Sequence, residues 1–317
     1  MNSGFFSKRF IVLVGKGGVG KSTMAASIGL AAARSGKKTL IAELNTTEKV
    51  PLLFEKSAVG YQIQPIAENL YCLNIQPEPA LREYGLMKLR IRAAYNVVFE
   101  NDFMRKLLRL VPGMNELLLI GKAWHLEQER DRSGQPVWDC IVVDAPATGH
   151  GISLLRLPHV ILDAVDKGPL AEDAGKIRDL LTDPRRTTLN IVTLPEEMPY
   201  QESLELLRQT EEVLKMPLGF LLINQVWPEV MDDRELDILN AYRDGHRGAQ
   251  QADGAAECVR YMVGRRKLQD EYLEKLKLRF RLPAIEIPYV FQESFGPSAI
   301  ETIALHLEKE IERHERQ

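Results

Sequence analysis

Short apolar runs alternate with amphipathic segments along the 317 residues of the chain. Runs such as Phe10–Val14 and Phe220–Ile223 are continuously apolar, which is typical of parallel strands buried on both faces. The segments between the runs carry apolar residues at helical spacing. This alternation predicts an α/β fold with a doubly wound, mostly parallel sheet of about seven or eight strands. The predicted strands are Phe10–Val14, Thr39–Glu43, Leu70–Ile75, Asp139–Val143, Thr188–Thr193, Phe220–Asn224 and Ala284–Ile287.

Longer helical stretches interrupt this alternation at about residues 79–129 and 231–279. A further amphipathic helix, Ser298 to about Glu315, is expected to pack on the sheet. Neither an internal repeat nor a low-complexity linker divides the chain. We therefore interpret residues 1–317 as a single domain with two helical elaborations.

A glycine- and lysine-rich segment follows the first predicted strand and reads Gly-Lys-Gly-Gly-Val-Gly-Lys-Ser-Thr. Its spacing matches a phosphate-binding loop, in which glycines let consecutive backbone N–H groups curl around phosphate oxygens. Lys21 would reach the β- and γ-phosphates, and the Ser22 hydroxyl would be a ligand of Mg²⁺. The residues expected to bind the nucleotide are Gly15, Lys16, Gly17, Gly18, Val19, Gly20, Lys21, Ser22 and Thr23.

A second motif ends the predicted strand Asp139–Val143 and reads Asp-Ala-Pro-Ala-Thr-Gly-His over residues 144–150. An acid at the end of an apolar strand is typical of a Walker B element, so Asp144 would hold Mg²⁺ directly or through water. Gly149 gives the following backbone freedom to respond to the γ-phosphate. Ser22 and Asp144 are thus the predicted magnesium ligands.

Composition limits the classes of partner. The net charge is −3 and the isoelectric point is about 6.1, so no bulk positive field favours nucleic acid or anionic lipid. Basic clusters at 105–109 and 265–267 are interpreted as solvated helix faces, and no nucleic-acid partner is expected. No run approaches the roughly 18–20 apolar residues of a membrane span, so no stable membrane insertion is expected. The short apolar run after Arg9 is unlike a secretory signal, and three scattered cysteines fit a reducing, cytoplasmic location.

A second lysine, Lys16, follows the first glycine of the loop. This string resembles the deviant Walker A motif of the ATPases that include MinD, ParA, the nitrogenase iron protein and ArsA. In that family the extra lysine crosses a dimer interface to the partner's nucleotide. Comparable arginine fingers are worth roughly 10³–10⁵ in rate. The resemblance implies a homodimer or a heterodimer with a paralogue.

Further segments resemble one branch of that family, namely ArsA and the tail-anchored-protein targeting ATPases. They include Pro146 to His150, Val192–Glu196 and Ile223–Gln225, and the resemblance extends from about Arg9 to Ala304. It implies a Mg²⁺-dependent ATPase of the P-loop fold, with ATP as the nucleotide. It also implies that Asn224 reads the adenine edge and that Pro288 lies in a second adenine-contacting loop.

Two departures concern metals and the motif after Asp144. The targeting ATPases bind zinc through a cysteine pair, whereas Val259 and Met262 stand at the matching positions and the adjacent Cys258 is alone. We therefore predict no zinc site. The cysteine spacing and the single ATPase cassette also disfavour metalloid efflux. In the segment after Asp144, Ala147 stands where the family usually has proline.

Another departure concerns the attacking water. Asn45 stands where the family has an aspartate that orients or activates this water, and an amide can position water but cannot accept its proton. We expect slow hydrolysis unless Asp144, Glu43 or Glu48 substitutes, and Glu43 faces the same side of the strand as Asn45. The predicted catalytic residues are Lys16, Lys21, Asn45 and Asp144.

Three functions remain open at this stage. In the targeting ATPases, helices equivalent to 79–129 form a groove for a hydrophobic protein segment, whereas ordinary core packing would explain the same apolar spacing. The favoured function is an ATP-hydrolysing dimeric switch that couples its cycle to such a client. The alternatives are a ParA- or MinD-type positioning ATPase and a non-hydrolysing, ATP-gated scaffold.

Overall fold

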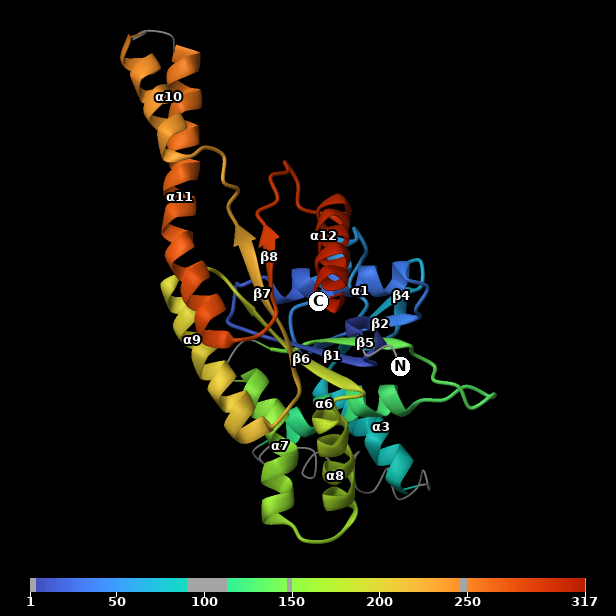
Figure 1. The fold of residues 1–317 in the computed structure, drawn as a ribbon. Coiled ribbons are helices and arrows are strands. Elements are labelled where there is room, and N and C mark those ends of the chain that lie inside the picture. Colours follow the sequence, from blue (N-terminus) through green and yellow to red (C-terminus); the bar gives the residue numbers. More distant parts are fainter. Residues whose placement is uncertain (1–3, 90–112, 147–149, 246–249, 317) are drawn as a thin grey trace.

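An eight-stranded sheet organises the computed structural model, which describes residues 4–89, 113–146, 150–245 and 250–316 (Figure 1). The strand order is β3-β4-β2-β5-β1-β6-β7-β8, and every neighbouring pair is parallel except the antiparallel β3–β4. The predicted α/β fold is confirmed. The strands are β1 Phe10–Val14, β2 Thr39–Leu44, β3 Gln64–Ala67, β4 Leu70–Ile75, β5 Cys140–Asp144, β6 Thr187–Thr193, β7 Leu218–Val226 and β8 Ala284–Pro288.

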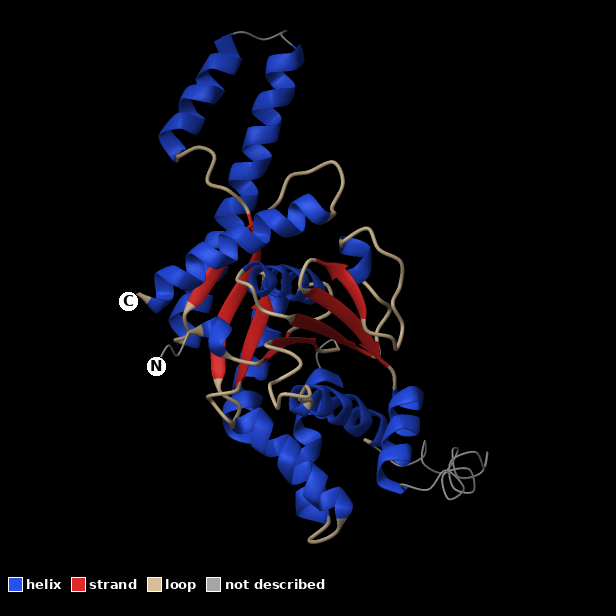
Figure 2. Cartoon of the chain, turned by 90° about the vertical axis from the view of Figure 1, so that its right-hand side faces the viewer, coloured by secondary structure: helices blue, strands red, loops and turns tan. Residues whose placement is uncertain are grey.

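Helices cover both faces of the sheet (Figure 2). α1 and α12 pack together on one face, while α3, α6, α7, α8 and α9 lie on the other. The helical elements are η1 Phe5–Ser7, α1 Lys21–Arg34, α2 Val50–Leu53, α3 Pro77–Leu89, α6 Met114–Gln128, α7 His150–Ala164, α8 Pro169–Thr182, α9 Glu197–Gln209, η2 Thr210–Leu214, α10 Asp233–Gly245, α11 Gln250–Phe280 and α12 Pro297–Glu315.

Strand β1 shows why the sequence runs are continuously apolar. Phe10, Val12 and Val14 belong to the core cluster under α6 and α7, whereas Ile11 and Leu13 belong to the cluster under α1 and α12. All five side chains are buried. A strand with no solvent face needs apolar residues at every position, because its side chains alternate between two cores.

The helical elaborations divide into separate helices. The described part of 79–129 comprises α3 and α6, and the middle of that stretch, including Met104, lies outside the described residues. The stretch 231–279 comprises α10 and α11, which pack side by side and project from the body (Figure 1). Gln269 anchors α11 to the sheet, because its side chain accepts a hydrogen bond from Trp227 N at 2.8 Å and donates one to Gln225 O at 3.0 Å.

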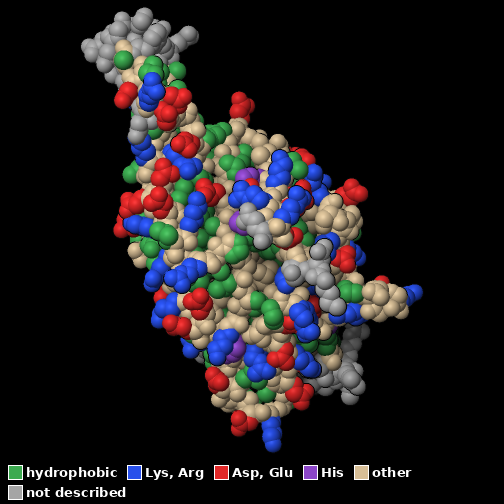
Figure 3. Space-filling view, in the orientation of Figure 1, with side chains coloured by type: hydrophobic (Ala, Val, Ile, Leu, Met, Phe, Trp, Pro, Cys, Tyr) green, Lys and Arg blue, Asp and Glu red, His purple; other side chains and the backbone are tan. Residues whose placement is uncertain are grey.

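On the face shown in Figure 3, basic and acidic side chains are interspersed over the described residues. Among those residues, no helix is both long and apolar enough to cross a bilayer.

The parallel arrangement brings several chemical motifs to one edge. β1, β2, β5, β7 and β8 run in the same direction, so the segments that follow them meet at their carboxyl ends. In doubly wound sheets this edge is where ligands bind.

Candidate functional site

The phosphate loop connects β1 directly to α1, which begins at Lys21. Lys21 is 9% exposed, and its Nζ donates hydrogen bonds to the carbonyl oxygens of Gly15 and Lys16, both at 2.9 Å. Burial lowers the pKa of Lys21, while the nearby Asp144 charge opposes that shift. The ammonium group therefore lies inside the loop, held by acceptors that a phosphate oxygen would replace.

Close approach fixes two glycines of this loop. A Cβ on Gly15 would lie 2.3 Å from the carbonyl oxygen of Val192. A Cβ on Gly20 would lie 2.2 Å from Asn224 Nδ2, and the φ of +94° at Gly20 is one that L side chains rarely adopt. The loop can keep this path only with glycine at both positions.

Asp144 and Ser22 meet beside the loop. Ser22 Oγ donates to Asp144 Oδ2 at 2.6 Å, and Asp144 is 2% exposed. Burial raises the pKa of Asp144, opposed by the Ser22 hydrogen bond and by the charge of Lys21. Asp144 Oδ1 is buried with no hydrogen-bond partner among the described residues, so it retains an acceptor for a cation or water.

These oxygen donors fit Mg²⁺, which prefers oxygen ligands and usually takes only one or two from the protein. Within the described ranges, no group of three or more His, Cys, Asp or Glu side chains could hold a metal ion. Ser22 Oγ and Asp144 Oδ1 are the protein oxygens that would hold a Mg²⁺ ion here, and the ion would polarise a bound phosphate.

Asn224 lies under the phosphate loop. Its Nδ2 donates to Val19 O at 3.0 Å, its Oδ1 accepts from Gln225 N at 2.9 Å, and it is 5% exposed. An amide has two donor and two acceptor positions, so each end retains capacity for a base edge. Val226 pairs with Pro288, which places the ends of β7 and β8 side by side. Adenine reading by Asn224 and Pro288 stays a prediction.

Asn45 extends β2 at its carboxyl end. It is exposed, adopts a φ of +47°, and its backbone N donates to Ile75 O at 2.8 Å. Two of the three acids expected to substitute for its missing carboxylate, Glu43 and Glu48, already accept hydrogen bonds from backbone amides. Glu43 is fully buried and accepts from the amides of Lys49 and Val50, while Glu48 accepts from the amides after Ala58.

Burial raises the pKa of Glu43 to about 7. The two amide hydrogen bonds oppose this shift, and the neighbouring charges of Asp144 and Glu48 add to it. Glu43 is buried and its Oε1 already accepts two amide hydrogen bonds, so it is not placed to take a proton from water in this conformation.

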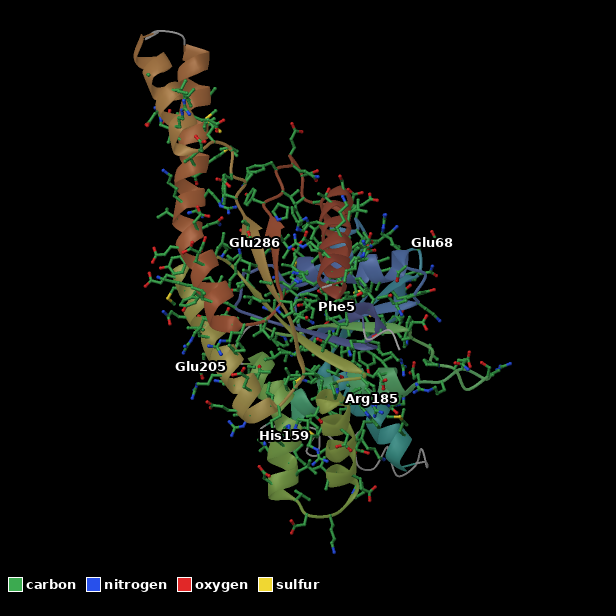
Figure 4. The ribbon with its side chains drawn as sticks, in the orientation of Figure 1. Phe5, Glu68, His159, Arg185, Glu205 and Glu286 are labelled. Carbon is green, nitrogen blue, oxygen red and sulfur yellow. The ribbon has the colours of Figure 1, made fainter. Side chains whose placement is uncertain are left out.

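Lys16 forms an ion pair within the same chain. Its Nζ lies 2.9 Å from Glu202 Oε1 on α9, and both side chains are about one-third exposed. The pair lies in the wall of a cavity of about 450 Å³ between the phosphate loop, α7 and α9. Glu205, on the same helix (Figure 4), also lines this cavity.

The remaining predicted positions divide into two groups. Residues 147–149 lie outside the described structure, and α7 begins at His150. Cys258, Val259 and Met262 lie on α11, where the Cys258 side chain is exposed.

A sequence model of the anion-transporting ATPases, the ArsA type, matches residues 8–170 and 169–252. The chain belongs to the ArsA family of ATPases.

Relatives of this ArsA-family chain occur in bacteria, archaea and plants. The ATPase BagA of Mycobacterium tuberculosis is 30% identical over 240 residues, which cover 72% of this chain and 68% of the relative. A putative arsenical pump-driving ATPase of Halobacterium salinarum is 27% identical over 91% of this chain and 42% of its own length. The ATPase GET3B of Arabidopsis thaliana is 25% identical, covering 71% of this chain and 66% of the relative.

Sequence reasoning alone missed two partners in this ArsA-family site. Nothing in the local pattern singles out Glu202, because its contact with Lys16 joins positions far apart in the sequence. The amide contacts of Glu43 were also missed, although its place two residues before Asn45 was a usable signal.

Proposed function

We propose that the protein is a Mg²⁺-dependent ATPase that works as a dimeric switch and couples its nucleotide cycle to binding of a hydrophobic protein segment. The observation that carries the proposal is the constellation at the sheet edge, in a chain of the ArsA family. Lys21 is buried inside the loop, and Ser22 lies against an Asp144 that retains a free buried oxygen.

Each residue has a defined part in this proposal. Bound ATP would supply the phosphoryl group that water attacks. Lys21 would exchange its carbonyl acceptors for phosphate oxygens and neutralise their charge. Ser22 and Asp144 would hold the metal. Asn45 would orient the attacking water through its amide, and because that amide cannot take a proton, turnover would be slow.

Lys16 would complete the partner's site. To do so it must break its ion pair with Glu202, and partly exposed pairs of this kind typically contribute about 0.2–1 kcal/mol. Such a pair holds the lysine in the isolated subunit without preventing its transfer to a phosphate.

A cavity of about 490 Å³, whose wall is mostly apolar but also carries Glu83, Lys122 and Asp173, supports the client-binding part of the proposal. It lies between α3, α6 and α8, and its wall includes Leu81, Met87, Met114, Leu117 and Trp124. Unbranched Met side chains adapt to varied apolar surfaces, which suits a client without a fixed sequence. The ArsA-family relatives BagA and GET3B are ATPases by name, which supports the nucleotide part of the proposal, whereas client binding rests on this cavity.

The first test measures ATP turnover and oligomeric state together, for the wild type and Lys16→Ala, with ATP and with ADP. We expect dimers with ATP but not ADP, and a turnover loss of roughly 10³-fold or more in Lys16→Ala. Tight ATP binding with no turnover and no response to Lys16→Ala would instead indicate an ATP-gated scaffold.

The role of Asn45 is tested by Asn45→Asp. If the amide limits hydrolysis, the carboxylate should raise kcat by roughly 10²-fold, the usual range for general-base catalysis, with little change in ATP affinity. An unchanged or lower kcat would show that Asn45 is not the residue that limits proton transfer.

Client binding is tested with a synthetic apolar helical peptide carrying a fluorophore. Met87→Glu places a charge in the cavity wall at a side chain that is 44% exposed, and Leu278→Glu places one on α11 at a side chain that is 78% exposed. We expect only Met87→Glu to weaken ATP-dependent peptide binding. Equal effects of both substitutions would place the client elsewhere.

A further inference from the structure

A row of three polar residues crosses the sheet and includes Asp144, the proposed magnesium ligand. Asn74 on β4, Glu43 on β2 and Asp144 on β5 pair in register on adjacent strands. Paired residues point to the same face of a sheet, so the three side chains lie side by side. All three are buried, with exposed fractions of 3%, 0% and 2%.

Two members of this row hold the loop that follows β2. Glu43 Oε1 accepts hydrogen bonds from Lys49 N at 2.8 Å and Val50 N at 3.3 Å. Asn74 Nδ2 donates to Thr46 O at 2.9 Å. The loop from Asn45 to Lys49 is therefore fastened at both ends to strands that flank or lie near Asp144.

The fastened loop carries groups that face the nucleotide edge. Asn45 is the predicted water-positioning residue, and it opens the loop. Lys49 closes it, and its positive charge opposes the rise in the pKa of Asp144 that burial causes and adds to the lowering of the pKa of Lys21 by burial. Holding the Lys49 amide thus fixes the backbone that carries this cation.

We propose that Glu43 is a positioning residue that ties the loop Asn45–Lys49 to the strand beside Asp144, so that the loop is set for ATP hydrolysis. The inference rests on the proposed ATPase function. It replaces the idea that Glu43 activates water, because the side chain is sealed from solvent and its oxygen already accepts two amides.

Positioning matters more here than in an enzyme with a carboxylate at residue 45. An amide helps only by orienting water, and a misplacement of about 1 Å can lower a rate by roughly 10²-fold. The hydrogen bonds from Glu43 need an acceptor oxygen, which glutamine retains and alanine lacks.

The experiment compares Glu43→Gln and Glu43→Ala with wild type, using Cys72→Ala as the matched control. The Cys72 thiol donates to the other oxygen of Glu43 at 3.7 Å and touches no loop amide. Asn74→Ala is a second route to a loosened loop that leaves β2 intact. Three quantities are measured: kcat, ATP affinity, and hydrogen exchange at the amides of Lys49 and Val50.

We expect Glu43→Ala to lower kcat by roughly 10- to 100-fold with ATP affinity within about threefold of wild type. Amide exchange at Lys49 and Val50 should become faster in the same variant, and Asn74→Ala should show a smaller loss of kcat. Glu43→Gln and Cys72→Ala should resemble wild type in kcat and in exchange.

Normal kcat and slow exchange in Glu43→Ala would overturn the inference, as would a Glu43→Gln variant as impaired as Glu43→Ala. If wild type hydrolyses no ATP, the proposed function fails. The exchange measurement then tests the anchoring of the loop by itself, so the two failures are distinguishable.

Discussion

Two glycines of the phosphate loop lie where a Cβ would collide with neighbouring groups, and the one at Gly20 meets the side chain of Asn224. The glycine pattern was visible in the sequence because the phosphate loop has a fixed spacing. The collision partner was not, since Asn224 comes from a strand two hundred residues later. The order of residue types therefore predicted the phosphate loop, whereas the contact of Asn224 that holds the loop could be seen only in the folded structure.

Gly20→Ala should weaken both ATP binding and folding. The methyl group would push the Asn224 side chain away from Val19. The backbone of the alanine would also have to adopt a left-handed conformation, which costs about 1–2 kcal/mol by itself. Titration with a fluorescent ATP analogue and thermal unfolding would measure the two effects.

Gly36→Ala is the matched control for that substitution. Gly36 also has a positive φ, of +86°, but a Cβ there would meet no described atom within 4 Å. Gly36→Ala should lower the thermal stability through backbone strain but should leave the ATP affinity unchanged. Equal losses of affinity in both variants would contradict the proposed contact with Asn224.

Strands were the elements that the sequence predicted best. Each predicted strand is present, with ends shifted by a few residues, because a strand buried on both faces needs a continuous apolar run. The missed strand, β3, lies at the sheet edge and buries only Ile66, so its run has no strong periodicity. Its antiparallel pairing with β4 is a tertiary choice that local pattern does not specify.

Glu202 on helix α9 holds Lys16 in an ion pair within the same chain. In the proposed dimer each of the two chains would have to break this ion pair, which is worth about 0.2–1 kcal/mol. We therefore expect Glu202→Gln to raise ATP-dependent dimer formation by about two- to thirtyfold. The dimerisation constant in sedimentation experiments with ATP is the measurement.

Glu205→Gln serves as the control on the same helix. Glu205, also on α9 (Figure 4), lines the same cavity, but its carboxylate accepts hydrogen bonds from Arg208 and Gln209. This substitution should leave dimerisation unchanged. If it acts as strongly as Glu202→Gln, the effect comes from the charge of α9 in general and not from release of Lys16.

At the scale of the whole molecule, one buried carboxylate joins elements at the edge of the sheet opposite the nucleotide. Glu127, at the end of α6, is fully buried and contacts Arg9 just before β1, at 3.0 Å, and Arg186 just before β6. No local pattern in the sequence indicates this cluster, because its three residues are far apart in the chain.

Glu127→Ala should lower the free energy of unfolding by about 3 kcal/mol, because two cations would lose their shared partner in a largely buried place. Urea unfolding monitored by circular dichroism would measure the change. Lys275→Ala removes an ion pair on exposed α11 and should give no detectable change. A Glu127→Ala variant as stable as wild type would show that the cluster does not hold the edge together.

Helix α11 is long and is hydrogen-bonded to the sheet near one end, so a small change of its tilt moves its other end by a large distance. It is 31 residues long, and Gln269 clamps it to the end of β7, just beyond Asn224. The part from Gln250 to Gln269 extends about 28 Å at 1.5 Å per residue. A tilt of about 10° at the clamp would therefore sweep the far end through roughly 5 Å. Small rearrangements at the carboxyl ends of the strands would therefore become displacements of several ångströms at the far end of α11.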